Sequence, residues 1–238
     1  MSTNNIFHKP IYIKRFGNVY PIQVGDWEKF ESCLNVLMIS KKHIEVTVDE
    51  DIALLHRIVL GLQDDEINKA LCKLFNLISK TDSFKLDSDH YHFINDESQR
   101  VDFENYDEIR NTIFNQNILF EPKVYKDPLM QQWANKVLEA RSKNAANITM
   151  EDMVTTVAVI SGKHYWDLEK YSIYQLKSEF QRINKIKAYD TTSIMFANPY
   201  ATDIKLDHFA EYLDMYADPY QDLFKSKDKL KNIDKALG

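Results

Sequence analysis

Two histidines and two aspartates lie close together near the middle of the sequence, at Asp87, Asp89, His90 and His92. The histidines are two residues apart on a segment with strand-like alternation, so their side chains would project from one face. Imidazole and carboxylate groups together form a ligand set that Zn²⁺ accepts. A hairpin turn, however, also uses aspartate for its own local hydrogen bonds, and no second ligand pair stands out. We interpret the segment as an exposed turn and expect no metal site.

Other residues have the types needed for acid-base catalysis. His164 could act as a general base, but spacing fixes no serine, cysteine or carboxylate partner for it. Acidic groups recur at residues 49–51, 64–66 and 151–152. Each of these groups comes at the start of an expected helix, where carboxylates cap free N–H groups and complement the helix dipole. We therefore expect packing and capping in place of catalysis, and no enzyme activity.

The composition argues against several classes of binding protein. The net charge of -6 argues against a sequence-independent nucleic-acid binder, which needs surplus lysine and arginine to neutralise phosphates. A phosphate-cradling loop needs closely spaced glycines. Here the five glycines are far apart, at positions 17, 25, 61, 162 and 238. The Walker and dinucleotide-binding fingerprints are therefore absent from the sequence, and we expect no cofactor.

The hydrophobic content is that of a globular protein. It is 44% of 238 residues, which is ample for a packed core. Cys33 and Cys72 fall on apolar helical stripes and are expected to be buried, reduced thiols. The N-terminus lacks a basic segment followed by an apolar run, so we expect no secretory signal. No apolar stretch approaches about 18 residues, so we expect no membrane span.

The pattern of the first 144 residues predicts a mixture of hairpins and helices. Residues 11–13 and 19–22 are prone to form strands and flank a turn expected at residues 16–18, and residues 84–93 form a second expected hairpin. Apolar residues at helical spacing follow several polar start signals. These starts are Asp26, Asp49 or Asp51, Asp64, Asn105 and Pro128.

Residues 147–190 carry the densest set of consistent local signals. Thr149 with Asp152, and Ser172 with Gln175, have the spacing of capping boxes. The first expected helix has apolar positions Met153, Val154, Val157 and Ile160 and ends at Gly162. The second expected helix carries the stripe Ile173, Leu176, Phe180, Ile183 and Ile186. These signals predict a helical hairpin with an aromatic joint at residues 163–168.

The domain organisation follows from a plausible linker at residues 142–147. We expect a mixed N-terminal domain over residues 1–144 and an all-helical C-terminal domain over residues 145–238. Asn198 and Pro199 should end the long helix, and residues 225–235 form a charged tail. The expected fold class is α+β, predominantly α-helical, with short N-terminal β-hairpins packed on helices.

Three segments resemble tail assembly chaperone-like proteins of tailed bacteriophages that infect Gram-positive hosts. The segments are residues 105–110 (NYDEIR) with 116–117 (QN), residues 120–123 (FEPK) with 133–136 (WANK), and residues 153–182. They cover roughly the C-terminal half to two-thirds of the chain. The N-terminal hairpin and helices match less specifically.

The resemblance implies a non-enzymatic protein that holds an aggregation-prone tail component, the long tape-measure protein, until the tail tube forms around it. An extended helical client could be covered by helix-in-groove packing. On that view, Tyr165, Trp166, Tyr171 and Tyr174 are the expected partner contacts, although each serves equally well as core. The protein would act in the host cell cytoplasm with other tail proteins, without cofactor, nucleic acid or membrane. Self-association stays open.

Two other classes remain open. The chain could be a stoichiometric virion subunit of the tail or baseplate, with a surface that docks to a ring. It could also be a small hydrolase or nuclease whose site is assembled from scattered residues, although no spacing predicts such a site.

Overall fold

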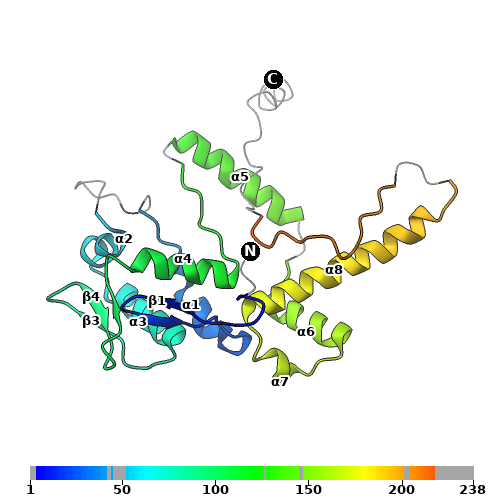
Figure 1. Ribbon diagram of the computed structural model, residues 1–238. Coiled ribbons are helices and arrows are strands. Elements are labelled where there is room, and N and C mark those ends of the chain that lie inside the picture. Colours follow the sequence, from blue (N-terminus) through cyan, green and yellow to red (C-terminus); the bar gives the residue numbers. More distant parts are fainter. Residues whose placement is uncertain are drawn as a thin grey trace. The chain divides into compact units, whose positions relative to one another are not determined.

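The computed structural model describes residues 4–41, 44, 52–125, 127–144, 147–200 and 204–217, with only the backbone at 141, 142 and 144. The expected helix start at Asp49 or Asp51 and the charged tail at 225–235 lie outside these residues. Contacts divide the chain into two units. The first comprises Met1–Leu119 and Thr149–Leu213, and the second Phe120–Ile148 and Asp214–Gly238. The fold class is α+β, and helices dominate it (Figure 1).

The first unit begins with the expected N-terminal hairpin. Strand β1 (Ile11–Ile13) pairs with β2 (Gly17–Val19) in antiparallel register. The turn lies at residues 14–16, two residues earlier than the sequence predicted. The reason is that Phe16 is fully buried and stacks on Phe84, with 5.7 Å between ring centroids. Gly17 then takes a φ of +89°, which favours glycine because it has no Cβ.

Helices cover the core of this part of the chain. Helix α1 packs on α3, and Asp64 caps α3 by accepting hydrogen bonds from the N–H groups of Glu66 and Ile67, as expected. A π-helical segment, η2, continues α2 directly. The bounds are η1 Val24–Asp26, α1 Trp27–Leu37, α2 Leu54–His56, η2 Arg57–Leu62, α3 Asp65–Ser79 and α4 Tyr106–Asn117.

The second hairpin is present and belongs to a three-stranded sheet. Strand β4 (His92–Ile94) lies between β3 (Lys85–Asp87) and β5 (Arg100–Val101). The sequence does not predict β5, because that strand has only two residues. Asn105 precedes α4, but its side chain does not cap that helix. It accepts from the N–H of Asp102 at 2.9 Å and donates to the carbonyl of Arg100 at 2.8 Å, so it fixes the end of β5.

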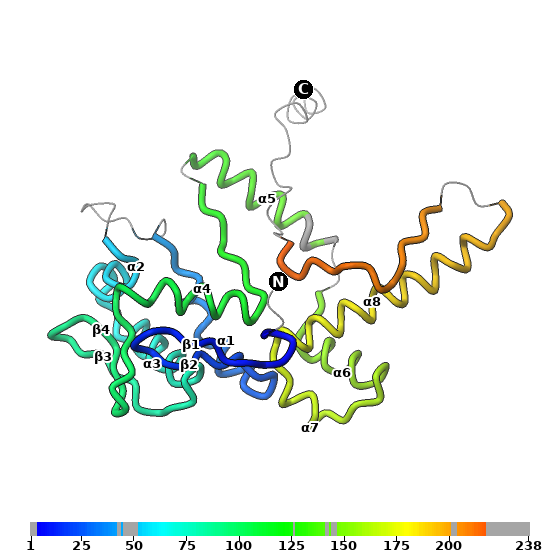
Figure 2. The backbone as a smooth tube through the Cα atoms, viewed as in Figure 1, coloured from blue at the N-terminus to red at the C-terminus, as the bar shows by residue number. Residues whose placement is uncertain are grey.

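The expected helical hairpin follows in the same unit. Helices α6 (Met150–Ser161) and α8 (Ile173–Phe196) pack on each other, with the short α7 (Tyr165–Leu168) between them in the chain (Figure 2). Both capping boxes are formed, and Gly162 ends α6 with a φ of +71°. Helix α8 ends before Asn198, as expected.

Backbone hydrogen bonds join this hairpin to the N-terminal segment. Val24 N–H donates to the Tyr171 carbonyl at 2.8 Å, and Ile173 N–H donates to the Ile22 carbonyl at 3.1 Å. The N-terminal segment and the helical hairpin are therefore parts of one contact unit. The domain boundary expected between residues 144 and 145 falls inside the second unit, and it stays a prediction.

The second unit contains α5 (Pro128–Asn144), which begins at Pro128 as expected. The helix continues through residues 142–144, which the sequence analysis had placed in a linker. An ion pair between Lys143 and Glu139, four residues apart with 2.7 Å between Nζ and Oε1, supports this last turn. Residues 145–146 of the expected linker lie outside the described part of the chain.

The capping box of α6 makes a stability prediction. The Thr149 hydroxyl accepts from the Asp152 N–H at 3.2 Å, and the Asp152 carboxylate accepts from the Thr149 N–H at 2.8 Å. We expect Thr149→Ala to lower the free energy of unfolding by about 1 kcal/mol, because it leaves a helix N–H group without its partner. Urea denaturation followed by circular dichroism measures this change. Thr155→Ala, inside the same helix, is the matched control, and an equal loss there would refute the role of the cap.

Candidate functional site

Helix α7 presents two aromatic side chains to solvent. Tyr165 is 56% exposed and Trp166 is 61% exposed, whereas Leu168 is fully buried and anchors the helix. The ring of His164 stacks on the Trp166 indole, with 4.5 Å between centroids. His164 thus contributes to aromatic packing at this joint, the role that the sequence analysis gave it in preference to a general base.

The other two expected contact residues point into the protein. Tyr174, in the first turn of α8, is only 8% exposed. Tyr171 is partly buried against the core of the helical hairpin, and the Lys163 ammonium lies 5.1 Å from its ring centroid. Lys163 is itself held by Glu179, with 2.7 Å between Nζ and Oε2. The surface therefore retains Tyr165 and Trp166, and a contact role for any of the four stays a prediction.

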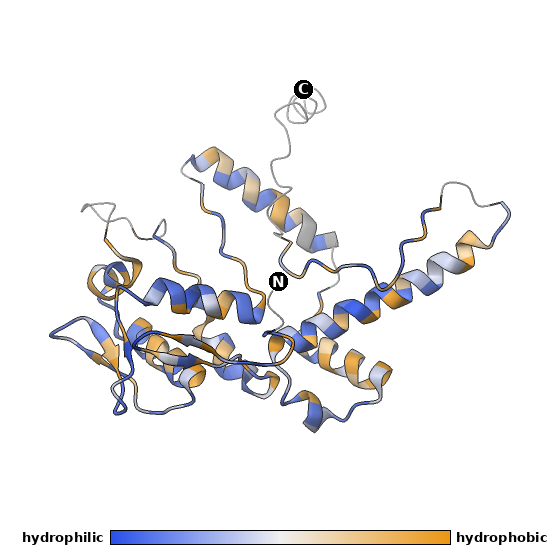
Figure 3. Cartoon of the chain, in the orientation of Figure 1, coloured by the Kyte–Doolittle hydropathy of each residue, from blue (hydrophilic) through white to orange (hydrophobic). Residues whose placement is uncertain are grey.

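Helix α6 adds aliphatic side chains to the exposed aromatic pair. Val159 is 78% exposed and Ile160 is 46% exposed at the C-terminal end of α6, which contacts α7. Val159, Ile160, Tyr165 and Trp166 are thus exposed on two helices that contact each other, and we call these four residues the α6–α7 patch. Figure 3 shows how apolar α6 is along its length. Of the apolar positions expected along this helix, Val157 is buried and Ile160 is exposed, because a helix that is apolar on most sides gives periodicity no clear face to select.

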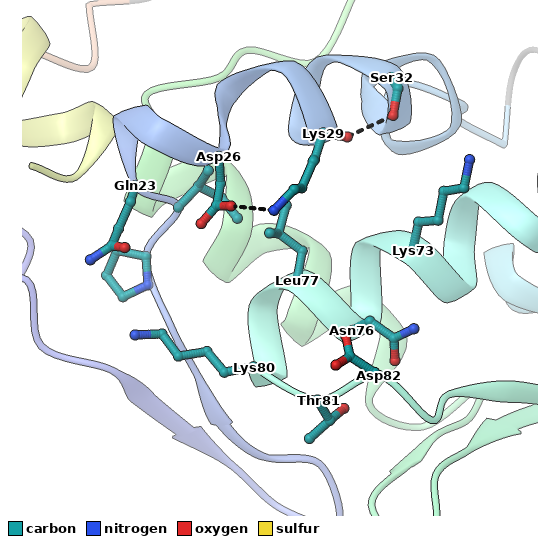
Figure 4. A pocket seen from close by; sticks show the side chains of 12 residues that line it. Gln23, Asp26, Lys29, Ser32, Lys73, Asn76, Leu77, Lys80, Thr81 and Asp82 are labelled. Carbon is teal, nitrogen blue, oxygen red and sulfur yellow. Dashed lines mark hydrogen bonds and ion pairs between the residues drawn. The ribbon is translucent and has the colours of Figure 1, made fainter. Parts of the chain in front are cut away.

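A pocket of about 670 Å³ lies between α1, α3 and the segments at residues 21–23 and 80–82 (Figure 4). Several of the polar side chains that line it already form hydrogen bonds. Lys29 Nζ donates to Asp26 at 3.0 Å, the Ser32 hydroxyl donates to the Lys29 carbonyl at 2.6 Å, and the Asn76 side chain accepts from the Phe84 N–H at 2.9 Å.

The chemistry of this pocket is that of a solvated surface recess. Its lining residues include Lys73 and Lys80, but neither histidine nor cysteine. The Lys80 ammonium lies over the Tyr20 ring at 4.7 Å. The only hydroxyl groups that line it are those of Ser32 and Thr81. The first donates to the Lys29 carbonyl, and the second lies 2.8 Å from the Ser79 hydroxyl.

The tip of the β3–β4 hairpin brings Asp87, His90 and His92 together. His92 begins β4 and is buried, whereas His90 lies in the exposed turn, so the two histidines do not share a strand face as expected. The His90 Nδ1 atom is 3.0 Å from Asp87 Oδ2. The other oxygen of Asp87 accepts from the Asp89 N–H at 3.1 Å, which is the local turn hydrogen bond that the sequence predicted.

Burial controls the ionisation of several groups in the first unit. Cys33 is buried, Cys72 is half-buried and both are free thiols. Burial raises the pKa of each thiol, which keeps both protonated and poorly nucleophilic at neutral pH. Burial has the opposite effect on Lys177, where it lowers the pKa of the ammonium group to about 8. Lys177 Nζ donates to the carbonyls of Asn117 at 3.1 Å and Ile118 at 3.3 Å, at the end of α4.

Lys177 makes a prediction about pH. Its pKa is about 8 in the folded state and 10.5 ordinarily, so its contribution to stability is complete above pH 10.5 and is lost as the pH falls through 8. Relative to Lys177→Met, the wild type should gain about 1–2 kcal/mol of unfolding free energy between roughly pH 7.5 and 9.5. Urea denaturation at several pH values measures this. Cys33 and Cys72 affect stability with the opposite pH dependence, but equally in both proteins, so the comparison cancels their contribution. A difference in unfolding free energy between wild type and Lys177→Met that does not vary with pH would contradict the lowered pKa of Lys177.

No helix in the part of the chain that the structure describes has both the length and the apolar character needed to span a bilayer.

Comparison with known proteins adds a relative of nearly equal length. Residues 141–214 match a family described as the YomV second domain. The chain is 24% identical over 246 residues to the SPbeta prophage-derived uncharacterized protein YomV of Bacillus subtilis (strain 168), and the alignment covers 97% of this chain and 95% of that protein. No solved structure matches the chain. The family match begins near the boundary expected between residues 144 and 145, and it includes the helical hairpin that carries the α6–α7 patch.

Proposed function

We propose that this chain is a non-enzymatic phage protein that assists tail assembly by binding another tail component, a helical client of the tape-measure kind. It would act in the host cell cytoplasm before the tail is complete. The observation that carries the proposal is the α6–α7 patch, in which Tyr165, Trp166 and Val159 are each more than half exposed on a folded helical base.

The base beneath the patch supports this role because its helices are capped and one of their side chains is anchored in the core. Capping boxes at Thr149 and Ser172 fix the starts of the two long helices, and Leu168 anchors α7 in the core. Exposed aromatic and aliphatic side chains on such a base suit the apolar stripe of an amphipathic helix. Tyrosine and tryptophan are the residue types that most often dominate the energy of protein interfaces.

The phage context rests on two sequence observations. The chain is similar over almost its whole length to a prophage-derived protein, and three of its segments resemble tail assembly chaperone-like proteins. The tail component and the chaperone role come from the second observation alone. The tail assignment is therefore the part of the proposal that an experiment must test first.

A non-enzymatic role is supported by the state of the candidate nucleophiles and bases in the described residues. The ring of His164 stacks on Trp166, the Ser32 hydroxyl is bonded to its own helix, and burial keeps the Cys33 thiol protonated. These groups are positioned for packing. None of them forms the nucleophile-base pair that covalent catalysis requires.

The test is an affinity pull-down of the tagged protein from phage-producing cells, with mass spectrometry of purified virions in parallel. Enrichment of a tape-measure-like protein in the pull-down, with this chain absent from the virions, is the expected result. Presence in virions at a stoichiometric level would make the chain a structural subunit of the tail or baseplate. Failure to enrich any phage protein would contradict the proposal.

A further inference from the structure

The hairpin tip between β3 and β4 has the geometry of a small cation site. Asp87, His90 and His92 each offer one ligand atom, and these three atoms all lie within 4.8 Å of one another. We propose that Asp87 Oδ2, His90 Nδ1 and His92 Nε2 bind one Zn²⁺ ion. This inference is independent of tail assembly, and it revises the expectation from sequence that no metal site is present.

Two of the three distances between the ligand atoms suit a tetrahedral ion. Bonds of about 2.0–2.1 Å from zinc to nitrogen or oxygen place neighbouring ligand atoms roughly 3.3 Å apart. The Oδ2 atom of Asp87 is 3.0 Å from His90 Nδ1 and 3.7 Å from His92 Nε2, so these two distances bracket that spacing. The side chain of His90 is 71% exposed, so its ring can adjust to complete the site.

The imidazole of His92 is buried and turns Nε2 toward Asp87. Its side chain is only 7% exposed, and Nδ1 has no hydrogen-bond partner in the described residues. Nε2 faces the Asp87 carboxylate at 3.7 Å, which is beyond hydrogen-bond reach. Coordination of Zn²⁺ by Nε2 would give that nitrogen a partner, and Nδ1 would stay outside the coordination sphere.

The backbone holds the ligands in position. Asp87 and His92 are directly opposite each other in the antiparallel register of β3 and β4, so the sheet itself sets the separation of two ligands. The Asp89 N–H bonds Asp87 Oδ1, so Oδ2 is the oxygen that faces both histidines. Tyr91, between the histidines, has a φ of +52°, an uncommon conformation for a non-glycine residue that carries the chain from the exposed His90 to the buried His92.

The ligand set favours Zn²⁺ among common cations. Two imidazoles with one carboxylate suit zinc, whereas Mg²⁺ and Ca²⁺ prefer oxygen ligands alone. Three protein ligands leave a fourth position for water, on the side of the exposed His90. The proposed site therefore binds the ion at the hairpin tip and ties β3 to β4 through it.

The test is calorimetric titration of the full-length, tag-free protein with Zn²⁺ after removal of metal by a chelator. We expect one ion per chain with a dissociation constant of micromolar order or tighter. His90→Ala should weaken binding at least tenfold without loss of folding, because His90 is exposed. His164→Ala, which changes an exposed histidine outside the cluster, should bind as the wild type does.

A spectroscopic measurement tests the identity of the ligands separately from the affinity. Co²⁺ in place of Zn²⁺ should give the intense visible absorption of a four-coordinate ion, and Asp87→Asn should weaken that signal. Binding no tighter than about 100 μM would overturn the proposal. Equal binding by the wild type and His90→Ala would overturn it too, because the ion would then lie elsewhere.

Discussion

Replacing Phe75 by alanine is expected to lower the free energy of unfolding by about 3–5 kcal/mol. Phe75 is fully buried in α3, and its ring meets three other aromatic rings: Phe84, Phe93 and Tyr106, at centroid distances of 5.8, 5.1 and 6.5 Å. These neighbours come from the β3 side, from β4 and from α4. Phe75→Ala would leave a cavity between these elements. Because each element is held by its own contacts, they cannot all move in to fill the cavity, so the expected loss is large.

Chemical denaturation followed by circular dichroism measures this loss. Phe103→Ala is the matched control, because Phe103 is about half exposed and contacts His56 only at the surface. We expect that control to cost less than about 1 kcal/mol. Equal losses for the two variants would contradict the position of Phe75 at the centre of the core.

The second large effect concerns binding. Replacing both Tyr165 and Trp166 by alanine is expected to weaken affinity for the tail component by about 100-fold, which corresponds to roughly 2–3 kcal/mol. The same double variant should lose less than about 1 kcal/mol of stability, because both side chains lie mostly in solvent. Biolayer interferometry against the purified client, together with urea denaturation, separates the two quantities.

Phe196→Ala is the control for nonspecific hydrophobic binding. Phe196 is as exposed as Trp166, but it lies at the far C-terminal end of α8. Unchanged affinity is expected for this variant. If Phe196→Ala lost as much affinity as the double variant, binding would depend on nonspecific hydrophobic contact and not on the α6–α7 patch. Full affinity in the double variant would place the client elsewhere.

Most features decided within a few residues could be predicted from the sequence. The capping boxes at Thr149 and Ser172, the cap at Asp64 and the helix start at Pro128 are confirmed. Each of these depends on hydrogen bonds or backbone angles within one helical turn, so no knowledge of the tertiary fold is needed. The caps expected at Asp26 and Asn105 are wrong, because neither side chain accepts a hydrogen bond from its helix. The α+β fold class is confirmed as well, because the apolar residues of its helices and strands recur with the period of each element.

Features decided by tertiary contacts could not be predicted. The N-terminal turn is shifted because Phe16 packs on Phe84, which is far away in the sequence. The sequence left open whether Tyr174 is a contact or part of the core, and the structure buries Tyr174 while Ile160 is exposed. Both are apolar or aromatic residues at helical spacing, and only the packing partners determine which of them faces solvent.

The hairpin tip shows the same limit at a candidate site. The spacing of His90 and His92 predicted a common strand face, whereas the structure gathers them beside Asp87 by placing one histidine in the turn. Sequence spacing therefore identified the residues but not their geometry. The expectation that no metal binds rested on the lack of further ligands in the sequence, and titration with Zn²⁺ tests it.

The most direct test of the proposed function compares the wild type with the Tyr165→Ala, Trp166→Ala double variant in quantitative pull-downs from phage-producing cells. The account predicts that the wild type enriches a tape-measure-like tail protein and that the double variant, equally folded and equally abundant, loses most of that enrichment. Equal recovery of the tail protein by both, or enrichment of no phage protein by the wild type, would contradict it.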